Sequence, residues 1–179
     1  YHEELKKAGA CFGQSGEYER PMWFALNNST PEYKYSFNNQ NWYPSVEFEC
    51  KNTMENVGLF ELSPFSKYEI KGEKAHEELQ RLCTANIKNE IGKCTYTHML
   101  NEAGGIETDL TVVCVNKNHF RIISSAAVRT HDKAHILKHI SSDIEFKDVT
   151  DDYVCLGLFG PKSRDLMSKL SNQDFSNDK

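Results

Sequence analysis

The sequence lacks the short motifs that mark several common classes of protein. It has no GxGxxG fingerprint, no GxxxxGK(S/T) loop and no GxSxG elbow, so it shows no signature of a dinucleotide site, a P-loop or an α/β-hydrolase. It has no CxxC pair and no Cys/His spacing typical of zinc, so no metal is expected. No Lys/Arg cluster offsets the net charge of −5, which argues against a nucleic-acid partner.

Long hydrophobic runs are absent as well. The longest apolar stretches, such as 110–115, are far too short to span a bilayer, so no membrane partner is expected. The first residues look helical and charged, and show no secretory signal. What is present is typical of a globular domain with a substantial core: 179 residues, 39% hydrophobic and 11% aromatic.

The cysteines are scattered, and most have apolar neighbours. We interpret all six as buried, reduced thiols and favour this over disulfides: Cys11, Cys50, Cys83, Cys94, Cys114 and Cys155. Reduced thiols indicate a cytoplasmic location, or the mitochondrial matrix if the source is eukaryotic.

The most informative segment is 94–114. Two runs of alternating side chains, Cys94–Leu100 and Ile106–Cys114, flank an Asn-Glu-Ala-Gly-Gly turn, which predicts a β-hairpin. Glu107, Asp109 and Thr111 share one face of the second strand. Asp109 is therefore either a solvated strand residue or a carboxylate that accepts ligand N–H groups or moves a proton.

Helices and strands are interspersed along the rest of the chain, so the predicted fold class is α+β, with an antiparallel or mixed sheet and packed helices. Helices are expected at about 45–57, 73–82 and 130–140, with a last one from Gly160-Pro161. Further strands are expected at 58–62, 66–71, 119–124, 144–149 and 153–159.

Two segments invite other interpretations. Residues 1–44 are rich in aromatic residues, Asn, Gly and Pro and show little periodicity, which predicts an extended lead-in without a core of its own. His131, His135 and His139 recur on one helix face like a metal stripe. No carboxylate follows at matching spacing, so a solvated polar face is favoured.

The hairpin segment, YTHMLNEAGGIETDLTV at 96–112, closely resembles the aminomethyltransferase (glycine-cleavage T-protein) family. Other landmarks agree in order: VGLFELS at 57–63, IKGEKA at 70–75 and GLFGPKSR at 157–164. GACFGQSGEYERPMWF at 9–24 is similar to the junction that precedes the folate module in flavin-linked dimethylglycine and sarcosine dehydrogenases. This resemblance implies that 1–44 leads in from a flavoprotein module and that 45–179 is the first part of the folate-binding domain.

The resemblance also implies a function. Such modules bind tetrahydrofolate and pass it a one-carbon unit; in the dehydrogenases that unit comes from a methylated amine such as dimethylglycine or sarcosine. Asp109 matches the family's functional acid beside the reactive folate nitrogens. From their position on the first hairpin strand, Tyr96 and Met99 are expected to flank the same cavity. The expected cofactor of this region is tetrahydrofolate, with FAD bound only by a part that precedes Tyr1.

Two residues depart from the family pattern. Glu61 replaces the Asp of FDxS, and Ser125 replaces the Asn of a strand-end Ser-Asn-Ala, so a folate contact at Ser125 would use a hydroxyl. The family's pterin-gripping Glu and later Arg and Trp lie beyond Lys179. The chain is therefore expected to need the rest of its own polypeptide, and the isolated fragment to be inactive.

Two alternatives remain open at this stage. One is a stand-alone glycine-cleavage aminomethyltransferase, which the lead-in fits poorly. The other is a non-catalytic regulatory relative such as the pyruvate dehydrogenase phosphatase regulatory subunit, against which the retained Asp109 argues.

Overall fold

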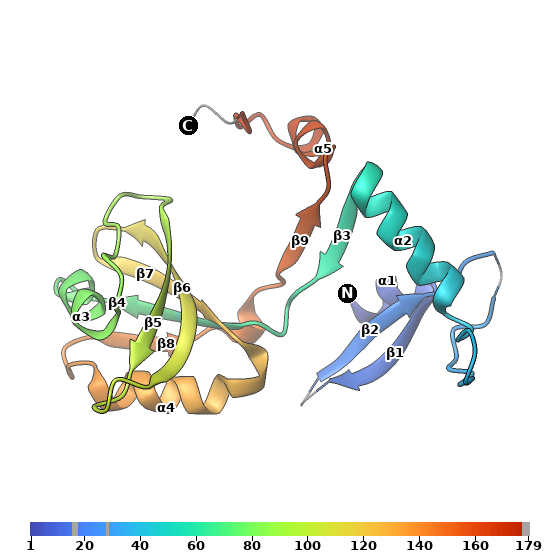
Figure 1. The fold of residues 1–179 in the computed structure, drawn as a ribbon. Coiled ribbons are helices and arrows are strands. Elements are labelled where there is room, and N and C mark those ends of the chain that lie inside the picture. Colours follow the sequence, from blue (N-terminus) through green and yellow to red (C-terminus); the bar gives the residue numbers. More distant parts are fainter. Residues whose placement is uncertain (16–17, 28, 177–179) are drawn as a thin grey trace. The chain divides into compact units, whose positions relative to one another are not determined.

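The computed structural model describes residues 1–15, 18–27 and 29–176 and divides the chain into two compact units. The inserted unit is Leu62–Cys155. The terminal unit combines Tyr1–Glu61 with Leu156–Lys179. Helices are interspersed with antiparallel strands in both units (Figure 1), which confirms the predicted α+β class.

A five-stranded antiparallel sheet forms the centre of the inserted unit, with strand order β5-β6-β7-β4-β8. The strands are β4 (Ser66–Lys71), β5 (Cys94–Leu100), β6 (Ile106–Asn116), β7 (His119–Ser124) and β8 (Glu145–Asp148). Two helices accompany the sheet, α3 (Ala75–Leu82) and α4 (Arg129–His139), and short 3-10 turns lie at Ala126–Val128 and Thr150–Asp152.

One face of this sheet carries the core of the inserted unit. Successive side chains of a strand point to opposite faces, so alternate residues enter the core. The buried cluster takes side chains from four strands, from the 83–87 connection, from both helices and from Ile144: Tyr68, Ile70, Ala75, Leu79, Cys83, Ile87, Met99, Leu110, Val112, Cys114, Phe120, Ile122, Ile136 and Ile144. We call the opposite side the outer face; it carries Glu69, Tyr96, Asp109 and Arg121.

In its described residues, the terminal unit contains two small sheets and three helices. Its elements are α1 (His2–Lys7), β1 (Ala10–Ser15), β2 (Tyr18–Phe24), α2 (Tyr43–Glu55), β3 (Gly58–Glu61), β9 (Leu156–Phe159) and α5 (Ser163–Leu170). β1 pairs with β2 and β3 with β9, both antiparallel. Arg20 of β2 donates from Nη2 to the Glu61 carbonyl oxygen at 2.8 Å, so a residue of the junction motif is bonded to the last residue of β3.

The expectation of a purely extended lead-in was wrong. Residues 1–44 form α1 and the β1–β2 hairpin, and Ala10, Cys11 and Trp23 are buried there. A register shift between Cys11 and Phe12 breaks the alternation of β1. On the paired strand Pro21, which lies opposite Phe12, has no N–H to donate and interrupts the pattern of β2. Gly16 and Glu17 of the junction motif, and Asn28 of the same segment, lie outside the described residues.

Helix α2 begins before the predicted Ser45. Trp42 is its N-cap and Pro44 lies in its first turn, where a missing N–H leaves no hydrogen bond unmade. Ser45 is instead a buried residue inside the helix. The last helix starts at Ser163, after Gly160 and Pro161 rather than on them.

The cysteines are all free, but they are not all buried. Cys11, Cys83 and Cys114 are buried and Cys155 is half-buried, whereas Cys50 and Cys94 are exposed. Burial raises the pKa of the Cys83 thiol to about 12, so this thiol stays protonated.

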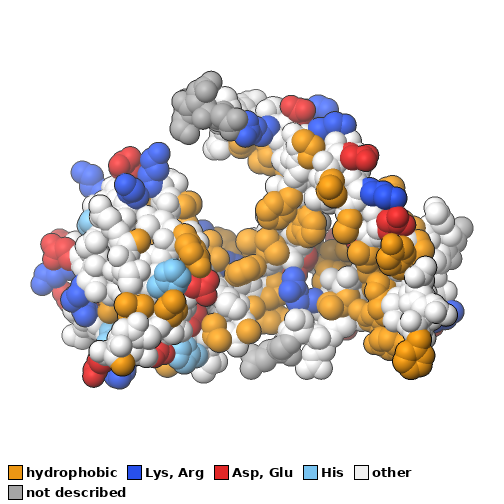
Figure 2. All heavy atoms as spheres, in the orientation of Figure 1, with side chains coloured by type: hydrophobic (Ala, Val, Ile, Leu, Met, Phe, Trp, Pro, Cys, Tyr) orange, Lys and Arg blue, Asp and Glu red, His pale blue; other side chains and the backbone are white. Residues whose placement is uncertain are grey.

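Both units expose large hydrophobic side chains, and the most exposed of them belong to the terminal unit. Figure 2 shows hydrophobic side chains spread over it, where the inserted unit displays mainly polar and charged groups. Phe37, Tyr35 and Met54 are 112%, 80% and 79% exposed. Across residues 1–15, 18–27 and 29–176, every helix is too short or too polar to cross a bilayer.

Candidate functional site

Asp109 lies on the outer face of β6, on the sheet's second strand. Its side chain is exposed, and its neighbours Thr108 and Leu110 point into the core, so packing on the other face fixes the strand that carries it. On β5 the Tyr96 hydroxyl donates a hydrogen bond to Asp109 Oδ2 at 3.1 Å. The structure thus joins two of the residues that sequence reasoning had singled out.

Tyr96 combines a flat apolar ring with this polar contact. The side chain is 62% exposed, and its ring meets His98 edge-on at 5.4 Å between centroids. The hydrogen bond to Asp109 raises the pKa of the Tyr96 phenol, because the carboxylate stabilises the protonated hydroxyl. The Tyr96 phenol therefore acts as the donor of this pair.

Ser125 follows the last residue pair of the β6–β7 ladder, which joins Leu110 to Ser124. Asp109 precedes that pair on the antiparallel neighbour, so both residues lie at the same end of the ladder. Ser125 is half-buried, accepts a hydrogen bond from the Ala127 amide at 3.4 Å and caps a 3-10 turn. Its hydroxyl hydrogen remains available as a donor.

Met99 lies on the opposite face of β5 from Tyr96. It is completely buried in the core cluster, with 0% exposure. Strand alternation dictates this placement, since residues three apart cannot share a face. The expectation that Tyr96 and Met99 flank one cavity is therefore corrected: Met99 supports the strand from the core.

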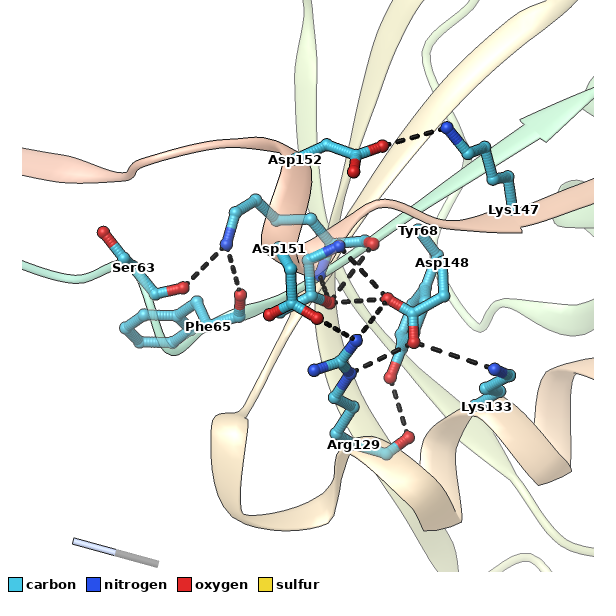
Figure 3. A network of polar contacts seen from close by, with 11 residues as sticks. Ser63, Phe65, Tyr68, Arg129, Lys133, Lys147, Asp148, Asp151 and Asp152 are labelled. Carbon is cyan, nitrogen blue, oxygen red and sulfur yellow. Dashed lines mark hydrogen bonds and ion pairs between the residues drawn. The ribbon is translucent and has the colours of Figure 1, made fainter. Parts of the chain in front are cut away.

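A polar network fixes the segment that follows Ser125. Figure 3 shows the Arg129 guanidinium against Asp148 and Asp151, with the Tyr68 hydroxyl donating to the Arg129 carbonyl at 2.8 Å. The hydrogen bonds from Arg129 and Thr150 outweigh burial and lower the pKa of Asp148. Because Asp148 stays ionised, the start of α4 is held to β8.

Sequence reasoning placed Glu107 on the face of Asp109 but missed the contacts that Glu107 makes. Glu107, its neighbour two residues earlier on β6, contacts Asn101 in the hairpin turn and His131 on α4. His131 also contacts the buried Asp132. Only the packing of α4 shows this, because Glu107 and His131 are 24 residues apart.

The three spaced histidines have different surroundings. His131 faces carboxylates, whereas the His139 ring contacts the His135 carbonyl at 2.8 Å. Within the described part of the chain, no group of three or more His, Cys, Asp or Glu residues is arranged to hold a metal ion.

The GCVT N-terminal domain family matches residues 1–179. The chain is 36% identical to 4-methylaminobutanoate oxidase (formaldehyde-forming) of Paenarthrobacter nicotinovorans, over 99% of this chain and 22% of that protein. It is 34% identical to mitochondrial dimethylglycine dehydrogenase of Rattus norvegicus, over 98% and 21%. It is also 33% identical to the mitochondrial pyruvate dehydrogenase phosphatase regulatory subunit of Mus musculus, over 95% and 20%.

A solved structure shares the fold. The crystal structure of glycine cleavage system aminomethyltransferase T from Bartonella henselae has a TM-score of 0.78 and 24% identity, covering 97% of this chain and 44% of that one. The chain spans 20–22% of the length of the three relatives named before it, the oxidase, the dehydrogenase and the regulatory subunit. The match of the whole sequence and the shared architecture lead to one conclusion: the chain belongs to the GCVT N-terminal domain family.

Proposed function

We propose that this chain forms one wall of a tetrahydrofolate site in an FAD-linked protein that demethylates a methylated amine such as dimethylglycine or sarcosine. The observation that carries the proposal is Asp109: an exposed carboxylate on a strand fixed by its core face, already engaged by one hydroxyl. The names of two relatives, a methylaminobutanoate oxidase and a dimethylglycine dehydrogenase, support the substrate class.

The side chains around Asp109 fit a reduced pterin. A carboxylate accepts N–H groups, the exposed Tyr96 ring offers a flat stacking surface, and Ser125 offers a hydroxyl at the same end of the ladder. Tetrahydrofolate would supply the nucleophilic nitrogens that accept the one-carbon unit. FAD is assigned to polypeptide outside these 179 residues.

Each residue has a defined part in this proposal. Asp109 would accept a hydrogen bond from a folate N–H group and would take up a proton there, while the folate would supply the nucleophilic nitrogen. Tyr96 orients the carboxylate through its hydroxyl, which leaves Asp109 Oδ1 to face the ligand. Holding the ligand beside the incoming one-carbon unit replaces a bimolecular encounter and supplies much of the rate.

The test uses the full-length protein that contains this chain. Tetrahydrofolate is titrated by calorimetry into the wild type, Asp109→Ala and Asp143→Ala, and the yield of methylenetetrahydrofolate is measured. Asp143 is a matched control, because it is an exposed aspartate of the same unit with one weak ion pair to Lys74 at 3.8 Å. Loss of product in Asp109→Ala alone supports the assignment. Equal yields from all three proteins would defeat it.

A second candidate is a non-catalytic regulatory role, which the 33% identity to a phosphatase regulatory subunit favours. Under that role the full-length wild type binds tetrahydrofolate without forming product. The isolated 179-residue chain is expected to bind tetrahydrofolate weakly in either case, because it supplies only one wall of the site. Micromolar affinity of the isolated chain would contradict this expectation.

A further inference from the structure

Both carboxylate oxygens of Glu107 are engaged by side chains from other parts of the inserted unit. Asn101 Nδ2 donates to Glu107 Oε1 at 2.8 Å, and His131 Nε2 lies 3.0 Å from Glu107 Oε2. The first contact comes from the β5–β6 turn and the second from α4. Glu107 therefore links the hairpin that carries Asp109 to a helix that packs on the core face.

Asn101 extends this link into the backbone of the turn. Its Oδ1 accepts hydrogen bonds from the Ala103 amide at 3.0 Å and the Gly105 amide at 2.9 Å. A Cβ atom at Gly105 would lie 2.9 Å from Asn101 Nδ2, so the glycine allows this close approach. The turn geometry and the position of Glu107 are thus coupled.

The other end of the link is anchored in the core. His131 Nδ1 lies 3.3 Å from Asp132 Oδ1, and Asp132 is 0% exposed. Among the residues that the structure describes, Asp132 Oδ2 has no hydrogen-bond partner. A buried carboxylate needs a compensating charge, and His131 is an ionisable group in direct contact with it.

The imidazolium form of His131 matches this geometry. Both ring nitrogens face carboxylate oxygens, which can only accept hydrogen bonds when ionised. A neutral imidazole donates from one nitrogen alone, so one contact becomes a lone pair against a carboxylate. The cation satisfies both.

We propose that Glu107, His131 and Asp132 form a charged clamp that holds the start of β6 against α4 and thereby positions Asp109. The three are positioning residues, since none is assigned a ligand contact. The inference deepens the proposed function and rests on it only for what Asp109 binds. On this proposal the charge of His131 controls the position of Asp109.

The charges around His131 set the direction of its pH dependence. Asp132 and Glu107 raise the pKa of His131 above its ordinary value, and the hydrogen bonds that Asn101 and His131 donate to Glu107 lower the pKa of that carboxyl. His135, one turn along α4, has a lowered pKa because of burial and the neighbouring His139. The clamp is fully formed at a pH below the unfolded pKa of histidine and is lost as the pH rises through the raised pKa.

The test is a nuclear magnetic resonance pH titration of the 179-residue chain, following the His131 ring and the amides of Gly104, Gly105 and Asp109. The three amides are expected to shift with the midpoint of His131. In Glu107→Gln that midpoint moves to lower pH, and in His131→Gln the amide shifts are lost. His139→Gln, on the same helix without a carboxylate contact, keeps the wild-type behaviour.

A variant with a permanent charge distinguishes loss of the His131 titration from misfolding of the variant protein. His131→Lys keeps a cation over the whole range, so its hairpin amides should not shift with pH near the His131 midpoint. An unchanged His131 midpoint in Glu107→Gln, or amides that ignore His131, would overturn the clamp. The titration contains no folate, so it stands independently of product formation by Asp109→Ala.

Discussion

Two acidic residues on the outer face of the same sheet have opposite surroundings. Glu69, on β4, is 6% exposed and is contacted by Arg121 at 2.7 Å and Lys71 at 2.9 Å, with His119 at 3.3 Å. Arg121 in turn lies 4.3 Å over the Tyr153 ring. Asp109, on β6, is exposed and accepts one hydrogen bond from a neutral phenol.

The difference shows which of the two carboxylates is available to bind a ligand. Nearby cations and their hydrogen bonds outweigh burial and lower the pKa of Glu69 to about 2, so its lone pairs serve the fold. Among the residues that the structure describes, Asp109 contacts a neutral hydroxyl rather than a cation and keeps an oxygen for a ligand. A carboxylate saturated by cations stabilises the sheet, whereas one held by a single hydroxyl is suited to binding.

The largest expected effect is on stability in Glu69→Gln. Removing the charge leaves the half-buried Arg121 and Lys71 without their carboxylate partner, and the depressed pKa of Glu69 sets the expected cost at about 3 kcal/mol. Native-state hydrogen exchange of β6 and β7 measures it within the inserted unit. Glu77→Gln, an exposed position on α3, should change stability by less than about 0.5 kcal/mol. Equal effects of the two substitutions would contradict the comparison.

The same cluster should make the inserted unit acid-sensitive. Because the folded pKa of Glu69 is depressed from 4.5 to about 2, its contribution is complete above pH 4.5 and disappears as the pH falls towards 2. The shift corresponds to about 3 kcal/mol. Hydrogen exchange of the wild type and Glu69→Gln should therefore converge as the pH approaches 2, and a constant difference would argue against the cluster.

Two substitutions on β5 separate the faces of the sheet. Met99→Ala removes a fully buried side chain and should lose at least about 2 kcal/mol. Tyr96→Phe, on the outer face, should change stability by less than about 0.5 kcal/mol. Both tryptophans, Trp23 and Trp42, belong to the terminal unit, so their fluorescence shows whether that unit stays folded when β5 of the inserted unit is changed.

The smallest expected effect is local. Asp109→Asn removes the carboxylate that raises the pKa of Tyr96, so this phenol should titrate at lower pH while stability changes by less than about 0.5 kcal/mol. Carbon-13 resonances of labelled tyrosines measure the midpoint, and the other tyrosines serve as internal controls. An unchanged Tyr96 midpoint would show that the hydrogen bond does not form in solution.

The hairpin could be predicted well because its signals are local. Strict alternation and the Gly104-Gly105 turn defined β5 from Cys94 to Leu100, as observed, and placed the start of β6 correctly at Ile106. Gly104 adopts a φ of +82°, the left-handed conformation that such a turn requires. Strands β4 and β7 also have the predicted limits.

The N-terminal hairpin and parts of the site depend on information that alternation does not carry. Pro21 and the register shift at Cys11 hide the pattern of β1 and β2. Met99 and Tyr96 were grouped by closeness in sequence, although their odd separation assigns them to opposite faces. The contact between Glu107 and His131 follows from how α4 packs, which no local motif specifies.

The division of the chain also bears on the order in which it can fold during synthesis. β3 can pair only after β9 has been synthesised, about 100 residues later. The five strands of the central sheet all lie between β3 and β9 in the sequence, within one continuous segment. The Leu62 amide bonds to the Cys155 carbonyl at 2.9 Å, so the folded inserted unit already brings its own ends together. Closing the β3–β9 pair then avoids most of the entropy loss of a long flexible loop. A ribosome-bound chain stalled before β9 should therefore contain a folded middle and an unpaired β3.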